Sequence, residues 1–265
     1  MAQVERGDVA LVTGASSGIG AGFADRLARR GYDLVLVARR ADLLEEQARR
    51  LGAAHGVKVD VLPADLAEPS DLGRVERRLE SEARLALLVN NAGVGGISPF
   101  SSMDETAIAR MIALNVLALT QLTRAALPRL LERRGAVINV SSGAAFAAMN
   151  GAAVYGATKA YVAQFSRVLH EEVAKDGVKV QALIPGLTRT NLGGVDSSFF
   201  DQFPAEWVMT PEDLADASLA GLEMGELVCI PGLKSADDWT RLDEGLQALG
   251  MSVSSDRPAE RYGLG

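Results

Sequence analysis

Short apolar runs alternate along this chain with longer segments in which apolar residues recur every three or four positions. Apolar runs bounded by glycine or polar residues indicate strands buried on both faces, and the longer period indicates amphipathic helices. We expect strands at residues 9–12, 34–37, 57–62, 86–90, 136–141, 178–184 and 226–230. We expect helices at residues 21–30, 41–55, 70–83, 105–132, 153–175, 211–223 and 236–248.

Repeated strand–helix units predict an α/β fold: a doubly wound, Rossmann-type parallel sheet of about seven strands with helices on both faces. We expect a single domain over residues 1–251 and a polar tail over residues 252–265. The irregular stretch 186–210 is expected to be a substrate loop, with a disordered insertion as the alternative. Pro128 predicts a kink or a break in the helix around it.

Composition and charge exclude several classes of protein. A net charge of −7 disfavours nucleic-acid binding. No uncharged apolar run of about 18 residues predicts a membrane span, and the first residues lack the apolar core of a signal peptide. The single cysteine, Cys229, allows no internal disulfide, and with two histidines it gives no zinc-like cluster. We therefore expect a cytoplasmic protein without a metal.

A glycine-rich turn separates the first expected strand from the first expected helix. Its missing side chains let backbone N–H groups approach a phosphate at the start of the helix. Between a strand and a helix, this pattern predicts a dinucleotide site, although a merely tight turn is the alternative. The residues expected to bind are Gly14, Ser16, Ser17, Gly18, Ile19 and Gly20.

The second expected strand is followed by Arg39 and Arg40, and no carboxylate occurs before Asp42. An NAD site needs an acidic residue there for the ribose 2′-hydroxyl, whereas a guanidinium suits the 2′-phosphate of NADP. We therefore predict NADP(H) as the cofactor. The alternative is that both arginines only begin the next helix.

Polar residues also follow the third and fourth strands, at the edge of a parallel sheet where ligands bind. Asp65 and Leu66 follow the third strand, where a side chain can meet the edge of adenine. Asn91, Ala92 and Gly93 follow the fourth strand. The asparagine amide can bond to a neighbouring strand or to the ribose, and the alternative is that these residues form a plain turn.

Tyr155 and Lys159 are four residues apart on an expected helix, and Ser142 lies thirteen residues before the tyrosine. Lowering a tyrosine pKa from about 10 to about 7 takes about 4 kcal/mol, which one cation about 4 Å away can supply. Ser142 could then hydrogen-bond a substrate carbonyl. On its own, however, such a pair is commonplace on the solvated face of a helix.

Taken together, these motifs resemble those of the short-chain dehydrogenase/reductase family over about residues 8–231. The resemblance implies that Tyr155 is the general acid/base and that Lys159 also holds the nicotinamide ribose. It further implies that Ser142 positions the carbonyl and that Asn115 supports a water-linked proton relay through the lysine. The residues that carry the resemblance are Thr13–Gly20, Asp65-Leu66, Asn90–Gly93, Asn115, Ser142, Tyr155–Lys159 and Pro185-Gly186.

The resemblance adds further cofactor-binding residues and a function. Tyr155 and Lys159 are expected to contact the cofactor, as are Pro185, Gly186, Thr188 and Thr190. We expect an NADP(H)-dependent oxidoreductase that interconverts a carbonyl and a secondary alcohol. The alternatives are an NADP-binding sensor or interaction module without turnover, and an epimerase or isomerase that uses the same site.

The substrate is expected to be a hydrophobic small molecule, and the protein a homo-oligomer, either a dimer or a tetramer. The strand at 226–230 is followed by Pro231-Gly232 where many family members have Asp-Gly-Gly, which argues against the usual tetramer contacts without excluding a tetramer. The helix at 236–248 is expected to cover the pocket or to contact another subunit. The apolar candidates for the pocket are Phe146, Met149, Val94, Ile97, Phe199, Phe200, Phe203 and Trp207.

Overall fold

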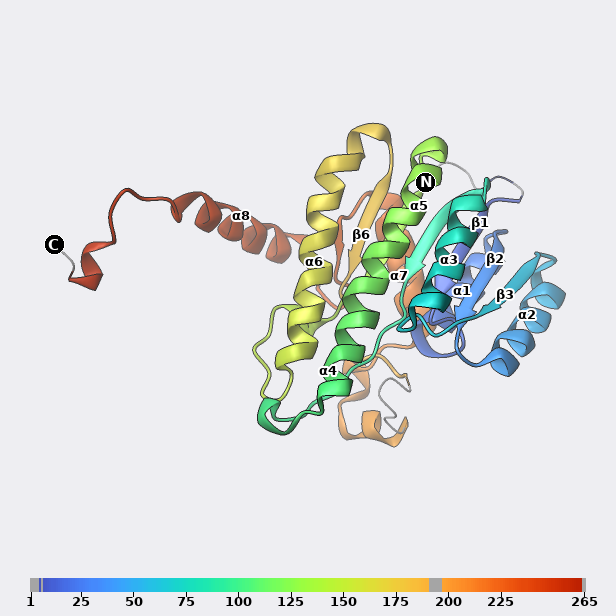
Figure 1. The fold of residues 1–265 in the computed structure, drawn as a ribbon, viewed down its shortest axis with the longest axis horizontal. Helices are drawn as coiled ribbons and strands as arrows, with labels where there is room; N and C mark the ends of the chain where they lie inside the picture. The colour runs from blue at the N-terminus through green and yellow to red at the C-terminus, as the bar shows by residue number, and fades with distance from the viewer. Residues whose placement is uncertain (1–4, 6, 191–196, 264–265) are drawn as a thin grey trace. The chain divides into compact units, whose positions relative to one another are not determined.

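A parallel sheet of seven strands forms the centre of the fold (Figure 1). The computed structural model describes residue 5 and residues 7–190 and 197–263. The strands pair in parallel in the order β3-β2-β1-β4-β5-β6-β7, so the doubly wound fold class is confirmed. They are β1 (Val9–Thr13), β2 (Asp33–Ala38), β3 (Val59–Pro63), β4 (Leu85–Asn90), β5 (Ala136–Val140), β6 (Lys179–Leu183) and β7 (Val228–Cys229).

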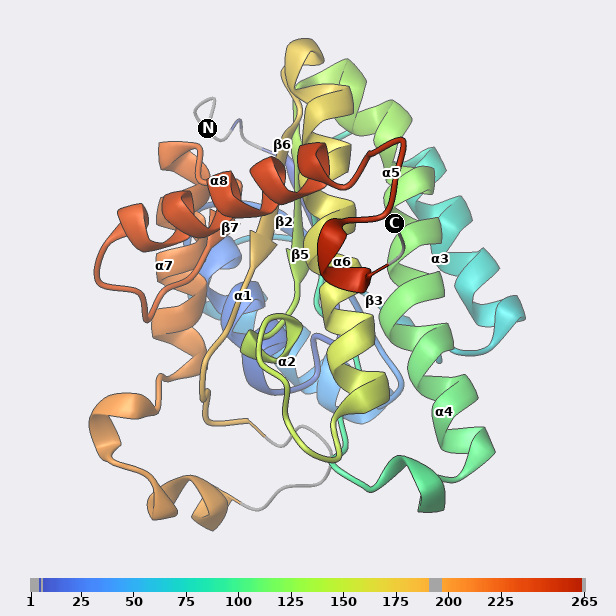
Figure 2. The ribbon, with the colours of Figure 1, turned by 90° about the vertical axis from the view of Figure 1, so that its left-hand side faces the viewer.

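Helices cover both faces of the sheet, and Figure 2 shows α1 and α7 on one side with α3 and α5 on the other. Since β4 returns to lie beside β1, the strand order reverses there, and the carboxyl ends of these strands border the crevice where ligands bind in such sheets. The helices are α1 (Gly18–Arg29), α2 (Ala41–His55), α3 (Pro69–Ser81), α4 (Glu105–Ile112), α5 (Leu119–Arg133), α6 (Ala153–Val173), α7 (Pro211–Met224) and α8 (Ala236–Ser252).

The core divides into two layers because successive strand residues point to opposite faces. Val12 and Leu36 join the layer under α1, α2 and α7, whereas Leu11 and Val37 join the layer under α3, α5 and α6. Every residue of β1 is buried, as expected for a central strand covered on both faces.

The helical stretch from α4 to α5 differs from the prediction. It is interrupted at the π-helical turn Ala113–Ala118, whereas α5 continues through Pro128. The predicted break at Pro128 is therefore wrong, and the predicted kink stays a prediction. Pro128 and Arg124, one turn earlier, are both exposed, so water can satisfy the carbonyl that lacks a partner N–H.

Within the described residues, one helical stretch, Glu105–Arg133, is long and apolar enough to cross a membrane by length and composition. A helix in the core of a globular fold meets the same test, so this evidence is weak. Leu122, Ala126 and Leu130 of this stretch are buried in the core layer beneath α3, α5 and α6.

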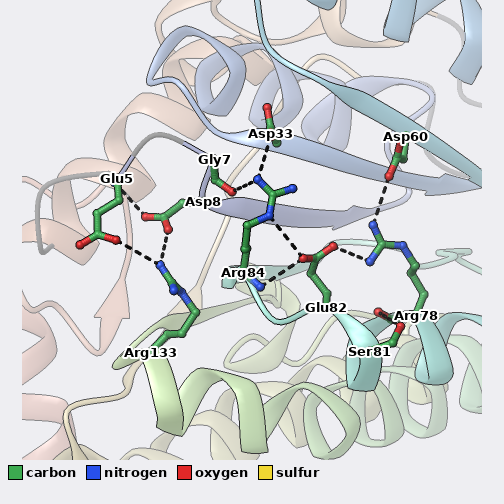
Figure 3. A network of polar contacts seen from close by, with 10 residues as sticks. All are labelled: Glu5, Gly7, Asp8, Asp33, Asp60, Arg78, Ser81, Glu82, Arg84 and Arg133. Carbon is green, nitrogen blue, oxygen red and sulfur yellow. Dashed lines mark hydrogen bonds and ion pairs between the residues drawn. The ribbon is translucent and has the colours of Figure 1, made fainter.

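Ion pairs join the amino ends of the strands, at the edge opposite the crevice (Figure 3). Arg84, which precedes β4, donates to the carbonyl of Gly7 at 2.6 Å and pairs with Asp33 at 3.2 Å. Asp8, before β1, pairs with Arg133 at the end of α5. The network ties segments that are distant in sequence.

Two compact units, Met1–Pro231 and Gly232–Gly265, divide the chain. The second contains α8, which has no buried residue and continues to Ser252, past the predicted end at 248. The single domain over residues 1–251 and its polar tail stay predictions. Within the expected substrate loop, two 3-10 turns occur at Ser197–Gln202 and Ala205–Trp207, and residues 191–196 lie outside the described part.

Candidate active site

The glycine turn after β1 has the backbone that its sequence predicts. Gly14 and Gly18 adopt positive φ angles of 66° and 56°, which glycine adopts without strain. A Cβ on Gly20 would lie 2.3 Å from the carbonyl oxygen of Gly14, so the turn packs directly on the first turn of α1. Free backbone N–H groups at this helix start suit an anionic phosphate.

Asn91 supports this turn from the end of β4. Its Nδ2 donates to the carbonyl of Thr13 at 2.9 Å, and its backbone N–H donates to the Thr13 hydroxyl at 3.0 Å. The bond to a neighbouring strand is thus present, and the bond to the ribose stays a prediction.

Arg40 reaches back over the glycine turn. Its Nη2 donates to the hydroxyls of Ser16 at 3.0 Å and Ser17 at 2.9 Å. Arg39 is exposed beside it, and both arginines line the same cavity as the glycines. Although Arg40 is also the N-cap of α2, its side chain is directed to the turn and not to that helix. Two cations therefore border the place where the turn would hold a phosphate.

On the other side of the cavity, α6 places Tyr155 and Lys159 next to the end of β5. The Lys159 amine donates to the carbonyl of Val140 at 2.9 Å, and the Ser141 hydroxyl donates to the Lys159 carbonyl at 2.7 Å. These two bonds fix α6 against β5. Ser142, the next residue after the strand, lies within hydrogen-bond reach of Tyr155.

Asn115 lies in the π-helical turn and connects three segments. Its Oδ1 accepts from the N–H of Val94 at 2.9 Å, while its Nδ2 donates to the Val94 carbonyl at 2.9 Å and to Thr158 Oγ1 at 3.1 Å. Thr158 donates in turn to the carbonyl of Tyr155 at 2.8 Å. Both amide hydrogens of Asn115 are thus used, so a proton relay through this residue would have to use an oxygen, either the backbone carbonyl or the second lone pair of Oδ1.

Burial changes the pKa values of the two central residues in opposite directions. Burial raises the pKa of Tyr155, and a hydrogen bond from Ser142 opposes this rise only in part. Burial lowers the pKa of Lys159 to about 8. The lowered tyrosine pKa expected from the sequence is therefore not observed, because burial outweighs the stabilisation of the phenolate.

A cavity of about 640 Å³ joins the glycine turn to these residues. It is lined by most of the residues predicted for the site, but not by Ser16, Gly20 or Asn115. Val37, Ala38, Ala64, Leu114, Val140, Ser141 and Leu187 line it without having been predicted. The predicted residues on it are Gly14, Ser17, Gly18, Ile19, Arg39, Arg40, Asp65, Leu66, Asn91, Ala92, Gly93, Ser142, Tyr155, Lys159, Pro185, Gly186, Thr188 and Thr190.

Only part of the predicted substrate pocket lies on this cavity. Val94, Phe199 and Phe200 line it, and Phe199 packs edge-on against Phe200 with ring centroids 5.5 Å apart. Ile97 and Trp207 are instead strongly exposed. Phe146 and Met149 line a separate, open hollow between α6 and the segment before it. Ser141 follows the end of β5, and Leu187 follows the end of β6. Their position after the carboxyl ends of strands is the signal that could have identified them.

No group of three or more His, Cys, Asp or Glu residues in the described part of the chain is arranged to hold a metal ion. The charged groups of the cavity are arginines, one lysine and one aspartate. This set suits an anionic organic ligand.

Comparison with known sequences gives related reductases. A family model described as short chain dehydrogenase matches residues 8–198. The very-long-chain 3-oxoacyl-CoA reductase of Anas platyrhynchos is 33% identical over 230 residues, which are 84% of this chain and 72% of that protein. The reductase of the same name from Rattus norvegicus is 33% identical over 206 residues, which are 76% of this chain and 65% of that protein.

Solved structures share the fold over almost the whole chain. A short-chain dehydrogenase from Sphingobium yanoikuyae in complex with NADPH is 43% identical, with a TM-score of 0.89 over 96% of this chain and 99% of that one. A bulky-bulky ketone specific alcohol dehydrogenase from Comamonas testosteroni is 39% identical, with a TM-score of 0.88 over 97% and 99% of the two chains.

Proposed function

Since this chain is an oxidoreductase that belongs to the short-chain dehydrogenase family, we propose that it interconverts bulky ketones and secondary alcohols with NADP(H). The observation that carries the proposal is a single cavity with the glycine turn and two arginines at one end and Ser142, Tyr155 and Lys159 at the other. The cavity thus provides a binding end and a reactive end.

The residues of this cavity fit the dinucleotide. The glycine turn offers N–H groups to the pyrophosphate, and Arg39 and Arg40 offer cations to a 2′-phosphate. Arg40 already bonds to the serines of the turn, so its guanidinium lies within reach of a phosphate bound there. The NADPH complex of the Sphingobium yanoikuyae relative supports the same cofactor. When bound, this cofactor supplies or accepts the hydride.

Three side chains handle the oxygen of the substrate. Tyr155, whose raised pKa keeps the phenol protonated, donates a proton to the carbonyl oxygen during reduction. Ser142 donates a hydrogen bond to the same oxygen and stabilises the charge that develops there. Lys159 stabilises the phenolate that Tyr155 becomes, since its protonated amine lies on the same face of α6.

The proposed substrate has two large apolar groups on the carbonyl carbon. Phe199, Phe200 and Leu187 contribute apolar surface to the cavity. The Comamonas testosteroni relative is named for bulky-bulky ketones, and the Anas platyrhynchos relative for very-long-chain 3-oxoacyl-CoA. In both names the carbonyl lies within a large molecule.

An activity screen tests the proposal. The purified protein is mixed with small, aryl and branched ketones and with NADPH or NADH, and the absorbance of the reduced cofactor at about 340 nm is followed. Faster loss of NADPH with the bulkier ketones supports the proposal. NADPH binding without turnover of any ketone or alcohol would instead favour a sensor module. Retained cofactor and a changed stereocentre would favour an epimerase.

We also propose that the protein is a cytoplasmic homo-oligomer. Ile112 and Leu117 are about half exposed on the stretch from α4 into the π-helical turn, and Tyr161 and Val168 are similarly exposed on α6. α4 and α6 are in contact with each other, and exposed apolar rows on neighbouring helices suit a subunit contact. Light scattering of the protein and of Leu117→Glu tests this, with dissociation expected in the variant.

A further inference from the structure

Arg189 lies beside the cavity without lining it, although its neighbours in sequence, Thr188 and Thr190, do line it. The backbone at this position is held by two hydrogen bonds. The N–H of Arg189 donates to the carbonyl of Met209 at 3.0 Å, and the N–H of Met209 donates to the carbonyl of Leu187 at 2.9 Å. The side chain of Arg189 therefore starts from a well-anchored segment at the edge of the cavity.

This side chain contacts the 3-10 turn Ser197–Gln202, which carries two aromatic residues of the cavity. Nη1 of Arg189 donates to Oδ1 of Asp201 at 3.1 Å, and the guanidinium carbon lies 5.8 Å from the centroid of the Phe200 ring. At such a distance a cation is attracted to the face of an aromatic ring. One arginine thus contacts two consecutive residues of the turn.

Phe199 and Phe200 connect the turn to the cavity. Both line it, and Phe200 is only 6% exposed, whereas Phe199 is 39% exposed. Phe199 packs edge-on against Phe200 and also against Phe203, with ring centroids 5.3 Å apart in the second pair. These three phenylalanines form one aromatic cluster. The position of the turn therefore determines where this apolar part of the cavity lining lies.

The strength of the arginine contact follows from its exposure. Of the two side chains, Arg189 is 46% and Asp201 is 67% exposed. An exposed ion pair is weak, and a cation over an aromatic ring at an exposed site adds a similarly small amount. A 3-10 turn has poor hydrogen-bond geometry and depends on such contacts for a defined position. We therefore expect Arg189 to bias the position of the turn by several-fold without being needed for folding.

We propose that Arg189 is a positioning residue that sets the specificity of the site: by holding Asp201 and the Phe200 ring, it keeps the aromatic cluster in place for the larger group of a bulky ketone. This assignment rests on the proposed function. A small ketone needs only the reactive end of the cavity at Tyr155, so its turnover does not depend on Arg189. The signature is a change in KM that grows with ketone size, at nearly constant kcat.

The test compares a bulky aryl ketone with a small ketone in steady-state assays with NADPH. Arg189→Gln is expected to raise KM for the bulky ketone by about 5-fold and KM for the small ketone by less than about 2-fold. Asp201→Asn is expected to raise KM for the bulky ketone by about 2-fold, because the contact with the Phe200 ring remains. Fluorescence titration of each variant is expected to show unchanged NADPH binding, since neither residue lines the cavity.

Three further variants separate positioning from folding. Arg189→Lys keeps a cation for Asp201 and for the Phe200 ring and is expected to restore most of the lost affinity for the bulky ketone. Arg189→Gln combined with Asp201→Asn is expected to match Arg189→Gln alone, since both changes break one ion pair. Arg129→Gln is the matched control, because Arg129 pairs with Glu132 at 2.8 Å on α5 and does not line the cavity. It is expected to leave both KM values unchanged.

The outcomes distinguish the two proposals. An equal rise of both KM values in Arg189→Gln, or an equal loss of kcat with both ketones, would show a merely structural role and overturn the assignment. Unchanged KM values for both ketones would overturn it as well. A wild-type protein that reduces no bulky ketone with NADPH would overturn the proposed function, and the assignment with it.

Discussion

The amine nitrogen of Lys159 lies 5.8 Å from the centroid of the Tyr155 ring. Its hydrogen-bond partner is the carbonyl of Val140, so the ammonium faces the ring without bonding to it. Lys159 is buried and Tyr155 is partly buried, and burial favours the neutral form of each: a protonated phenol and, above a pH of about 8, an uncharged amine. The pair is thus prepared to donate a proton, which is the role of an acid in carbonyl reduction.

The buried lysine predicts how stability depends on pH. The pKa of Lys159 is about 8 in the folded protein and about 10.5 when unfolded, so the unfolded chain binds more protons between these values. The free energy of unfolding therefore rises from pH 8 to pH 10.5 relative to that of Lys159→Met, by up to roughly 3 kcal/mol. Urea unfolding of the wild-type protein and of Lys159→Met across this pH range measures the difference in the free energy of unfolding. A constant difference between them would contradict the buried, shifted amine.

Tyr155→Phe is expected to abolish most turnover and to leave cofactor binding intact. The variant loses the proton donor, which costs about 10²–10⁴-fold in rate. Assays with a bulky ketone and fluorescence titration with NADPH measure the two effects. Tyr161→Phe is the matched control, since Tyr161 lies on the same helix and its hydroxyl bonds to Thr120 at 2.9 Å, away from the cavity lining. A Tyr155→Phe protein with most of its rate would refute the acid role.

The arginines after β2 are expected to set the choice between the two cofactors. Arg40→Gln should weaken NADPH binding by about 10-fold or more and leave NADH binding unchanged, because only NADPH carries the 2′-phosphate. Arg39→Asp should shift the preference further toward NADH, since it adds a carboxylate beside the ribose. Parallel titrations give the ratio of the two dissociation constants. Arg49→Gln, an exposed change on α2, is the control. An unchanged ratio in both variants would contradict the phosphate site.

Thr158 and Thr123 have the same local bonding but different neighbours. Each threonine accepts from an asparagine Nδ2 and donates to a backbone carbonyl of its own helix. Replacing either by Val should cost about 1–3 kcal/mol of stability, since a buried amide loses its acceptor. Only Thr158→Val should lower kcat, because Thr158 connects Asn115 to the carbonyl of Tyr155.

Thermal unfolding and steady-state kinetics of both variants measure these effects, and Thr158→Ser should restore kcat. Equal kcat in the two Val variants would show that Thr158 has no positioning effect.

Gly20→Ala is expected to damage both the fold and the cofactor site. The added Cβ would lie 2.3 Å from the carbonyl oxygen of Gly14 and 2.5 Å from Asn91 Nδ2, so the turn would have to move. We expect a loss of about 1–3 kcal/mol in stability together with weaker NADPH binding. In Gly52→Ala, in the last turn of α2, the Cβ meets its nearest atom at 3.5 Å, and helix propensity favours the change. Chemical unfolding that ranks the two variants in the opposite order would contradict this packing.

The sequence predicted those parts of the protein that depend on neighbouring residues. Strands buried on both faces, the glycine turn and the arginines after β2 each produce a local pattern, and the fold class is confirmed. The first helix begins at Gly18, earlier than predicted, because the glycines of its first turn were interpreted as part of the turn.

Other features depend on contacts between residues far apart in the chain. The π-helical turn contains Asn115, whose side-chain amide bonds to the backbone of Val94. Local periodicity cannot identify this contact, because the two residues belong to different segments. Arg110 meets Asp65 across 45 positions. The break predicted at Pro128 was wrong because exposure to water, which the sequence pattern did not reveal, decides the cost of the missing N–H.

The ion pairs of Arg84 and Arg133 lie at the amino ends of the strands, whereas the cavity is formed at the carboxyl ends. Substitutions in the ion pairs and substitutions in the cavity therefore act at opposite edges of one sheet. An engineer could therefore change charges at the first edge for stability and reshape the cavity at the second edge for new substrates, since residues this far apart tend to contribute additively.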